Sequence, residues 1–329
     1  MTNLFVTLTA MITFASSSLA ATACPKPPPP ATDMNLTRYY SDAAKSQVDV
    51  AKRDDLRRQT ETQRTFLRTV SRNADKAWQA RTQADRNTAA RCAISWLGTW
   101  AGAGAYLGHM ATKQAEYQRN WDSAGFALAY LKVRKWASST QHDRIGRWLQ
   151  AMVRASYSAL SELGRTRNNH WYWHGLAQAG TALATGNAQA WQRATTIFGD
   201  AVDAIAANGT LPLELSRGAR ALHYHVFAVM PLVVMAELAD SRGEDWYRRQ
   251  GGALNRLVAV SVGGLVQPAL FDRFAGVNQE RPVNSRAGWA FLYAVRYPKA
   301  RIPPQLTKTR RHRLLGGDVR VLLAAMRAR

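Results

Sequence analysis

Apolar and small side chains recur every three or four residues along most of this 329-residue chain. This is the spacing of one face of a helix, and no alternating β-branched run is long enough to predict a strand. Helical segments are therefore predicted over 89–133, 142–163, 171–184, 188–206, 212–238, 246–262 and 287–296. Antiparallel helices joined by short loops favour a helical bundle or an α/α toroid.

Proline, glycine and charge mark the boundaries of these segments. Asn208-Gly209 predicts a turn, and Pro212 suits the first turn of the helix that follows. Pro231 is expected to kink or interrupt that helix. The charged segment 42–72 predicts an exposed helix, which is either a solvated face or a mobile lid. The basic run 308–313 predicts a loose tail.

The first residues have the features of a secretory signal peptide. Residues 4–15 are apolar, and the small residues up to Ala20 and Ala23 suit cleavage after either one. This stretch is too short to cross a bilayer, and no later segment is expected to cross one. We therefore expect a periplasmic or secreted protein with a signal peptide at 1–23, a proline-rich leader at 24–37, a helical domain at 38–307 and a basic tail at 308–329.

Cys24 and Cys92 are the two cysteines of the chain. In an oxidising compartment they can form a disulfide that ties the start of the mature chain to the fold. The alternative is one buried thiol and one flexible thiol. Cys24 also follows Ala23 as in a lipoprotein, but Ala21 stands where such signals usually have Leu, which argues against lipidation.

The chain carries 44 Lys and Arg against 22 Asp and Glu, a formal net charge of +22. A field of this sign attracts polyanions. Nucleic acid is not the expected partner, because the chain is expected to be exported and shows no recognised nucleic-acid-binding module. No nucleotide-binding glycine motif is present either. We expect an anionic polysaccharide as the partner, no membrane association, and a monomer.

Two segments, 167–173 and 211–225, contain side chains for one kind of reaction. β-Elimination in a 1,4-linked polyuronate removes the C5 proton beside the carboxylate and expels the C4 oxygen. Donors must stabilise the carboxylate, and a base and an acid must move the protons. The candidate donors and proton carriers are Asn169, His170, Arg217 and Tyr224.

Spacing places these side chains in pairs. If 216–230 is helical, Arg217 and Tyr224 lie two turns apart on one face. Asn169 and His170 precede the predicted helix that begins near Trp171. The electropositive end of that helix helps to keep the imidazole neutral. Each residue also has a structural alternative: the asparagine as a helix cap, the histidine as a hydrogen-bonded loop residue, and the tyrosine as part of the core.

A metal site is not expected. His170 and His174 are four residues apart, but no carboxylate follows at a useful spacing. His223 and His225 are two residues apart, so a helix points them to different sides. Neither a metal nor another cofactor is therefore predicted.

The segments 168–173 and 211–225 closely resemble the alginate lyases of polysaccharide lyase family 5, and similarity extends over about 39–298. The resemblance implies an incomplete α/α barrel of antiparallel helices around a deep substrate groove, with no metal. It also implies that Arg217, Asn169 and His170 stabilise the uronate carboxylate, while Tyr224 takes the C5 proton and returns a proton to the leaving oxygen.

The same resemblance suggests sugar contacts at Arg68, Gln114, Tyr117, Trp121 and His223. Gln114, Tyr117 and Trp121 also fit one helix face by their spacing, although Trp121 could instead belong to the core. The family usually has Ser after the motif histidine, where this chain has Trp171. We expect Trp171 to reshape a neighbouring subsite, by stacking on a sugar or by pointing into the core.

Stereochemistry predicts the polymer. In β-1,4-mannuronate the C5 hydrogen and the C4 oxygen leave from the same side, so Tyr224 can serve as both base and acid. Poly-β-D-mannuronate, as in alginate, is the expected substrate, with glucuronan and hyaluronate as further candidates. Arg217 is expected to lower the pKa of Tyr224 and to favour alkaline activity.

The alternative function is a non-catalytic periplasmic polyanion-binding protein on the same fold.

Overall fold

The computed structural model describes residues 24–162, 167–282 and 287–328, so the predicted signal peptide at 1–23 lies outside the described residues. The all-helical prediction is confirmed, since the two strands of the described chain have two residues each. The main helices are α1 (Val50–Gln59), α2 (Glu61–Gln79), α3 (Gln83–Gly102), α4 (Lys113–Val133), α5 (Ser139–Glu162), α6 (Asn169–Thr185), α7 (Ala188–Asp203), α9 (Ala221–Asp240), α10 (Arg249–Val266) and α12 (Gly288–Arg296).

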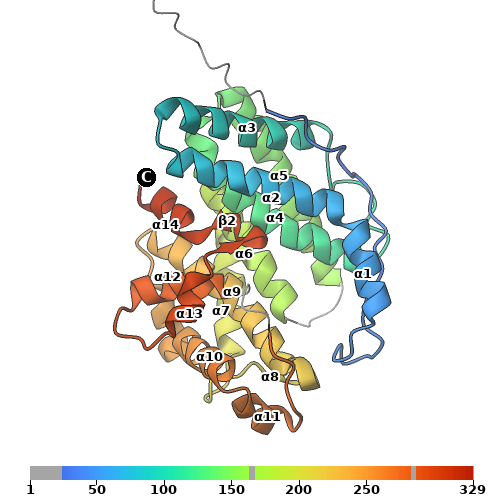
Figure 1. Ribbon diagram of the computed structural model, residues 1–329, viewed down its shortest axis with the longest axis vertical. Helices are drawn as coiled ribbons and strands as arrows, with labels where there is room; N and C mark the ends of the chain where they lie inside the picture. Colours follow the sequence, from blue (N-terminus) through green and yellow to red (C-terminus); the bar gives the residue numbers. More distant parts are fainter. Residues whose placement is uncertain (1–23, 163–166, 283–286, 329) are drawn as a thin grey trace, which may run out of the picture.

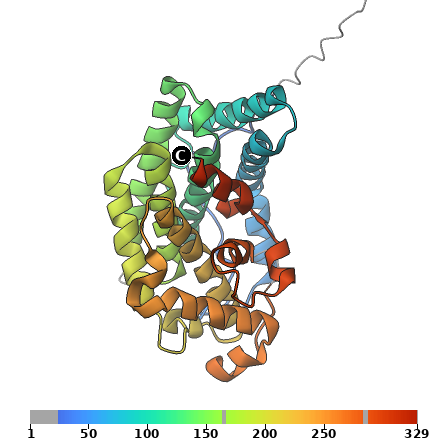
Figure 2. The same cartoon turned by 90° about the vertical axis from the view of Figure 1, so that its left-hand side faces the viewer.

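Shorter elements connect and close this set. They are η1 (Arg134–Trp136), α8 (Pro212–Leu215), η2 (Gly218–Arg220), η3 (Trp246–Arg248), α11 (Ala269–Ala275), α13 (Pro304–Lys308), β1 (Arg311–His312), η5 (Arg313–Leu315), β2 (Gly317–Asp318) and α14 (Val319–Arg327). Helix α6 is central and packs against α4, α5, α7 and α9, while α9 also contacts α10 and α12. The helices form an α/α barrel, with α6 and α9 in the middle of the molecule (Figures 1 and 2).

The predicted continuous helix over 212–238 is wrong, because the chain breaks between α8 and α9. Gly218 has φ +54°, a left-handed conformation that glycine adopts without a Cβ penalty. A 3-10 turn over Gly218–Arg220 then leads into α9. Arg217 therefore lies in the break and not on the face of α9.

Pro231 lies inside α9, which continues to Asp240, so of the two expected outcomes, a kink or an interruption, the interruption is wrong. Proline has no N–H to donate to the carbonyl four residues earlier, which is that of Phe227. The indole Nε1 of Trp173, on α6, donates to this carbonyl oxygen at 3.2 Å. The freed acceptor is thus satisfied by a neighbouring helix, which lets the helix continue.

The stretch Gly218–Asp240 has the length and composition of a membrane-spanning helix, although no such segment was predicted after the first residues. In the structure, 89% of its apolar window is buried inside the protein. It is therefore a core helix by its packing.

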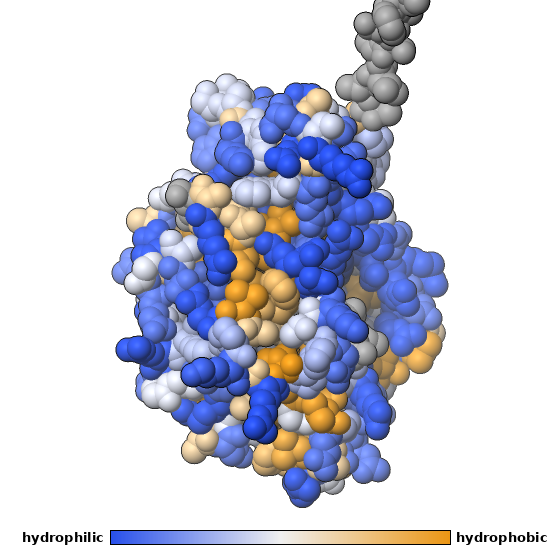
Figure 3. Space-filling view, turned by 60° about the vertical axis from the view of Figure 1, so that its left-hand side comes forward, coloured by the Kyte–Doolittle hydropathy of each residue, from blue (hydrophilic) through white to orange (hydrophobic). Residues whose placement is uncertain are grey.

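Hydrophilic side chains cover most of the face drawn in Figure 3, with hydrophobic residues between them.

The proline-rich leader lies along α3. The predicted disulfide between Cys24 and Cys92 is present, with the two Cα atoms 5.4 Å apart. The indoles of Trp96 and Trp100 donate to the carbonyl oxygens of Pro25 and Pro28 at 2.7 and 2.9 Å. The leader then runs down one side of the molecule toward α1 (Figure 1).

Two further expectations need correction. Segment 42–72 is not one exposed helix, because 42–49 is irregular and α2 buries Phe66, Leu67 and Val70 completely. The tail is not loose either, because Leu315 and Leu322 are fully buried. Helix α14, which follows the basic run 308–313, packs its apolar face against α4 and α12. The charges of the basic run gave no indication of this face.

Candidate active site

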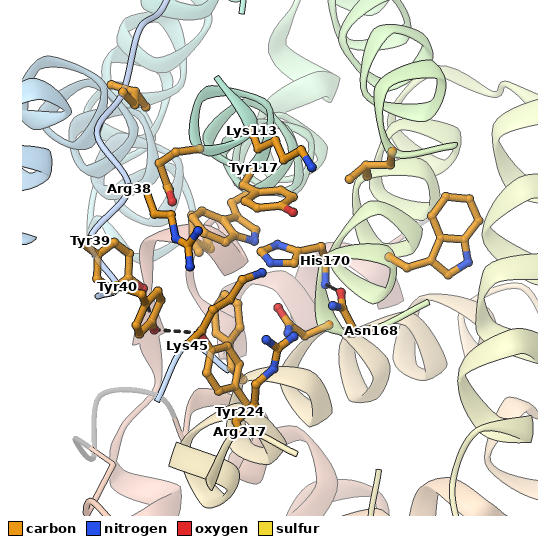
Figure 4. Close-up of a pocket in the computed structure, with 18 of the residues that line it drawn as sticks. Arg38, Tyr39, Tyr40, Lys45, Lys113, Tyr117, Asn168, His170, Arg217 and Tyr224 are labelled. Carbon is orange, nitrogen blue, oxygen red and sulfur yellow. Dashed lines mark hydrogen bonds between the residues drawn. The ribbon is translucent and has the colours of Figure 1, made fainter. Parts of the chain in front are cut away.

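A cavity of about 990 Å³ opens between the 36–45 segment, α4, the start of α6, α9 and the 312–314 segment. Asn169, His170, Arg217 and Tyr224 all line it. Figure 4 shows the last three of these side chains around a common space. The structure therefore brings the four predicted catalytic residues together, although 55 positions separate the first and last in sequence.

The start of α6 positions Asn169 and His170. The side chain of Asn168 caps the helix by accepting from the backbone N–H of His170 at 3.1 Å. The helix begins at Asn169, so both residues lie in its first turn and not before it as expected. Asn169 is fully buried, and its backbone N–H and its Nδ2 both donate to the carboxylate of Glu214.

His170 is held flat against aromatic rings of α4. Its ring stacks on Tyr117, with centroids 3.6 Å apart and planes 13° apart, and also faces Trp121 at 5.5 Å. Burial, followed by the positive charges of Lys45 and Arg217, holds the pKa of His170 well below the ordinary 6.5. The imidazole is therefore neutral at neutral and alkaline pH.

Arg217 lies between the buried Glu214 and the phenol of Tyr224. Its Nε lies 3.8 Å from Oε2 of the buried Glu214, and its Nη1 donates to the carbonyl of Ala44 at 3.4 Å. Its guanidinium carbon lies 5.1 Å from the centroid of the Tyr224 ring. The guanidinium is thus fixed beside the phenol.

Tyr224 is the first member of a chain of three phenols. Its hydroxyl donates to the hydroxyl of Tyr40 at 2.7 Å, which lies 3.0 Å from that of Tyr39. Burial raises the pKa of Tyr224 well above 10, although the Tyr40 hydrogen bond, Arg220 and Arg217 act in the opposite direction. The prediction that Arg217 sets a lowered pKa is therefore wrong, because desolvation outweighs the nearby charge.

Five of the six predicted sugar contacts line the cavity. Gln114, Tyr117 and Trp121 share one face of α4, as their spacing predicts. In the described part of the chain, the Gln114 Nε2 and Trp121 Nε1 atoms are buried without a hydrogen-bond partner. His223, on α9, lies within hydrogen-bond distance of the Arg220 guanidinium, at 2.8 Å from Nε2.

Trp171 and Arg68 behave differently. Trp171 lines the cavity, its Nε1 donates to Asp200 at 3.0 Å, and its ring packs against the core, where it stacks on the buried His174 with centroids 5.7 Å apart. Arg68 is not among the residues that line the cavity. It lies half-exposed on α2 and forms an ion pair with Glu61. The structure does not bring it to the other predicted contacts.

Several site residues were not identified from the sequence, among them Tyr40, Lys45, Arg38 and Lys113. Lys45 lies in the loop between Tyr40 and Val48, at φ +59°, and its side chain extends toward His170 (Figure 4). Arg38 and Lys113 also line the cavity. The high content of Lys and Arg was the available signal, but it does not show which cations face inward.

The cavity carries positive charge. Among the described residues, its lining contains six Lys and Arg side chains and no Asp or Glu: Arg38, Lys45, Lys113, Arg167, Arg217 and Arg313. With unpartnered donors on α4, this lining suits an anionic polymer with hydroxyl groups.

The histidine pair considered for a metal is differently engaged. Both ring nitrogens of His174 lie within hydrogen-bond distance of amides, Nδ1 of Asn120 at 3.1 Å and Nε2 of Gln178 at 2.9 Å. In the described ranges, no three His, Cys, Asp or Glu side chains are grouped to hold a metal ion.

Comparisons with known proteins identify the family of this chain. The alginate lyase family model matches residues 33–271. A polysaccharide lyase from Stenotrophomonas maltophilia is 40% identical over 289 residues, covering 87% of this chain and 86% of that protein. An alginate lyase from Pseudomonas aeruginosa strain PAO1 is 28% identical over 322 residues, covering 91% of this chain and 85% of the relative.

Solved structures show the same fold. Alginate lyase A1-III from Sphingomonas species A1 has a TM-score of 0.75 at 22% identity, covering 92% of this chain and 86% of the other. A Tyr-to-Phe variant of that enzyme complexed with a tetrasaccharide has a TM-score of 0.78, with the same coverage. Because the family model matches well over half of the chain, this protein belongs to the alginate lyase family and is a polysaccharide lyase.

Proposed function

We propose that this protein cleaves 1,4-linked polyuronates by β-elimination, with the poly-β-D-mannuronate of alginate as its main substrate. One observation carries the proposal: Asn169, His170, Arg217 and Tyr224 line a single cationic cavity in a member of the alginate lyase family. The relatives called alginate lyase and the neighbour complexed with a tetrasaccharide support a polysaccharide as the substrate.

In this mechanism the uronate carboxylate binds against Arg217, Asn169 and His170. Arg217 contributes a fixed positive charge, and the neutral imidazole contributes a hydrogen bond without repelling Arg217. As the C5–H bond breaks, negative charge moves onto the carboxylate, where preorganised donors stabilise it. The site therefore binds the transition state more strongly than the ground state.

Tyr224 moves the protons. Its phenolate removes the C5 proton, the C4–C5 double bond forms, and the bond from C4 to the bridging oxygen breaks. The same phenol then returns its proton to that oxygen, which leaves as a sugar hydroxyl. In the resting site the Tyr224 hydroxyl donates to Tyr40. Once Tyr224 has lost its proton, the Tyr40 hydroxyl turns, donates to the phenolate and so stabilises the base.

The same group can act twice only when proton and leaving oxygen lie on one side of the ring. This condition holds for mannuronate and not for guluronate, which is the C5 epimer. Glucuronate differs from mannuronate at C2, away from the bonds that break. We therefore include glucuronan and hyaluronate as secondary substrates, with Trp171 as the departure from the family pattern that motivates this breadth.

We also propose that the enzyme acts in the periplasm or outside the cell, as a monomer. The apolar stretch at 4–15 and the Cys24–Cys92 disulfide support this location, because disulfides persist in oxidising compartments. Cell fractionation tests the location, and sedimentation tests the monomer.

The test of function follows the ultraviolet absorbance of the unsaturated product on poly-mannuronate, poly-guluronate, poly-glucuronate and hyaluronate. We expect the highest rate on poly-mannuronate. Arg217→Ala should lose activity, whereas the matched arginine control Arg68→Ala should stay near wild type. Activity restricted to poly-guluronate would overturn the substrate assignment, and no product from any polymer would overturn the proposed lyase reaction.

A further inference from the structure

Glu214 is a fully buried carboxylate beside a site that binds carboxylates. It lies on the one-turn helix α8, behind Asn169, and is not part of the cavity lining. A negative charge here opposes an anionic sugar and loses its hydration. The mechanism described above does not use it, so its contacts must supply the reason for its presence.

Three contacts join Glu214 to Asn169. Its Oε1 accepts from the backbone N–H at 2.7 Å, and its two oxygens accept from Nδ2 at 3.0 and 3.1 Å. The two oxygens subtend a narrow angle at the amide nitrogen, so they share one of its two hydrogens. The other hydrogen and Oδ1 remain, and in the described part of the chain Oδ1 has no partner.

These contacts determine which way the amide faces. The two ends of an asparagine amide have nearly the same shape but opposite hydrogen-bonding character. With Glu214 ionised, a flipped Asn169 would place its Oδ1 against the carboxylate, which has no hydrogen to donate. The ionised carboxylate therefore holds one orientation of the amide, and it also pairs with Arg217 at 3.8 Å.

We infer that Glu214 is a positioning residue for the elimination reaction: it fixes the orientation of the Asn169 amide, and of the Arg217 guanidinium, toward the uronate carboxylate. This inference rests on the proposed function and adds to it a group that does not touch the sugar. It explains why a carboxylate is retained in a site with an otherwise cationic lining.

The charge of Glu214 depends on its surroundings. Besides the Asn169 amide, the groups that face it are Arg217, Lys45 and the phenol of Tyr172. Burial raises the pKa of Glu214 above the ordinary 4.5, while the hydrogen bonds from Asn169 and the two positive charges oppose this rise. Protonated Glu214 becomes a donor, which favours the flipped amide with Oδ1 toward it. Acidification should therefore lower kcat more steeply than loss of the Tyr224 phenolate alone, because Glu214 takes up a proton as well.

The experiment compares Glu214→Gln with wild type on poly-mannuronate across pH. Glutamine keeps the shape but replaces one carboxylate oxygen with a donor, so at every pH it no longer excludes the flipped Asn169 amide. The matched control is Glu237→Gln, which removes another buried carboxylate, one that accepts from Tyr247 and pairs with Arg296 outside the cavity. Thermal unfolding of both variants separates a loss of stability from a loss of positioning.

We expect Glu214→Gln to lower kcat about 10- to 100-fold with KM changed less than about threefold, as for a misplaced transition-state donor. The variant should also lose the additional steepness that Glu214 gives to the acid side of the pH profile, and keep the dependence that comes from Tyr224 and His170. Unchanged kcat, or an acid limb identical to wild type, would overturn the inference while leaving the proposed function intact.

Two other outcomes are also informative. If Glu214→Gln folds poorly, the wild-type profile decides, because a decline in kcat that fits the uptake of a single proton all the way down to pH 4.5 contradicts the inference. If the wild-type protein forms no unsaturated product from any polyuronate, the proposed function fails first, and the positioning role fails with it.

Discussion

The hydroxyl of Tyr224 donates to the hydroxyl of Tyr40 at 2.7 Å, across 184 positions of sequence. Tyr40 belongs to the irregular segment that follows the disulfide-tethered leader, and Tyr224 belongs to the core helix α9. The proton carrier in our mechanism is therefore held by a contact between the N-terminal arm and the barrel interior. This contact makes the arm part of the active site.

Tyr40→Phe should slow the reaction without abolishing it. The substitution removes the hydrogen bond that stabilises the Tyr224 phenolate, and hydrogen bonds to charged groups contribute about 1.5–3 kcal/mol. We expect kcat to fall about 10- to 100-fold at a fixed alkaline pH. Tyr247→Phe is the matched control, because it also removes a buried hydroxyl, one bonded to Glu237 at 2.9 Å. Equal activity of both variants would contradict a role for Tyr40.

Activity should rise with pH through the alkaline range. The base acts as phenolate, which forms above its pKa, and burial raises the pKa of Tyr224 above the ordinary 10. His170 stays neutral over the same range because its pKa lies well below 6.5. The dependence of kcat/KM on pH, measured with a stable enzyme, should therefore show no alkaline plateau below pH 10. A plateau reached at neutral pH would contradict Tyr224 as the base with a raised pKa.

Added salt should weaken capture of the polymer. Six Lys and Arg side chains line the cavity, and salt screens their attraction for the uronate carboxylates. We expect kcat/KM to fall mainly through KM between about 0.05 and 0.5 M sodium chloride, where the screening length shortens severalfold. Sucrose at matched osmolality is the control. A kcat/KM value that does not depend on salt would show that charge does not drive binding.

The disulfide should contribute to stability. It closes a loop between Cys24 and Cys92, which are separated by 68 residues. Replacing both cysteines with serine should lower the free energy of unfolding by about 2–4 kcal/mol. Urea unfolding of the oxidised wild type and the double variant measures this difference. Equal stability would mean that the hydrogen bonds of the leader, including those from Trp96 and Trp100, hold it without the covalent link.

The fold class and the four catalytic candidates could be predicted from the sequence, because both depend on local information. Helical periodicity predicted the helices, and the segments 168–173 and 211–225 predicted the chemistry. Arg217 and Tyr224 do share one cavity, but not for the reason expected, since a left-handed glycine separates Arg217 from α9.

The remaining features depend on contacts between distant parts of the chain. Neither Tyr40 nor Lys45 carries a local signal that places it against Tyr224 or His170. The raised pKa of Tyr224 follows from burial, which spacing alone does not reveal. The basic tail packs because of apolar residues that come after its charges, such as Leu322. Sequence reasoning therefore identified the groups that we propose to react, but not the groups that surround them.

Tyr224→Phe tests whether the oxygen of Tyr224 carries the proton in the elimination. The variant keeps the ring that packs beside Arg217 but lacks the oxygen that carries the proton. Product formation from poly-mannuronate is followed by ultraviolet absorbance, and binding of the same polymer is measured in parallel. We expect the variant to lose turnover while it still binds the polymer with near-wild-type affinity. Turnover close to wild type in this variant would contradict this expectation.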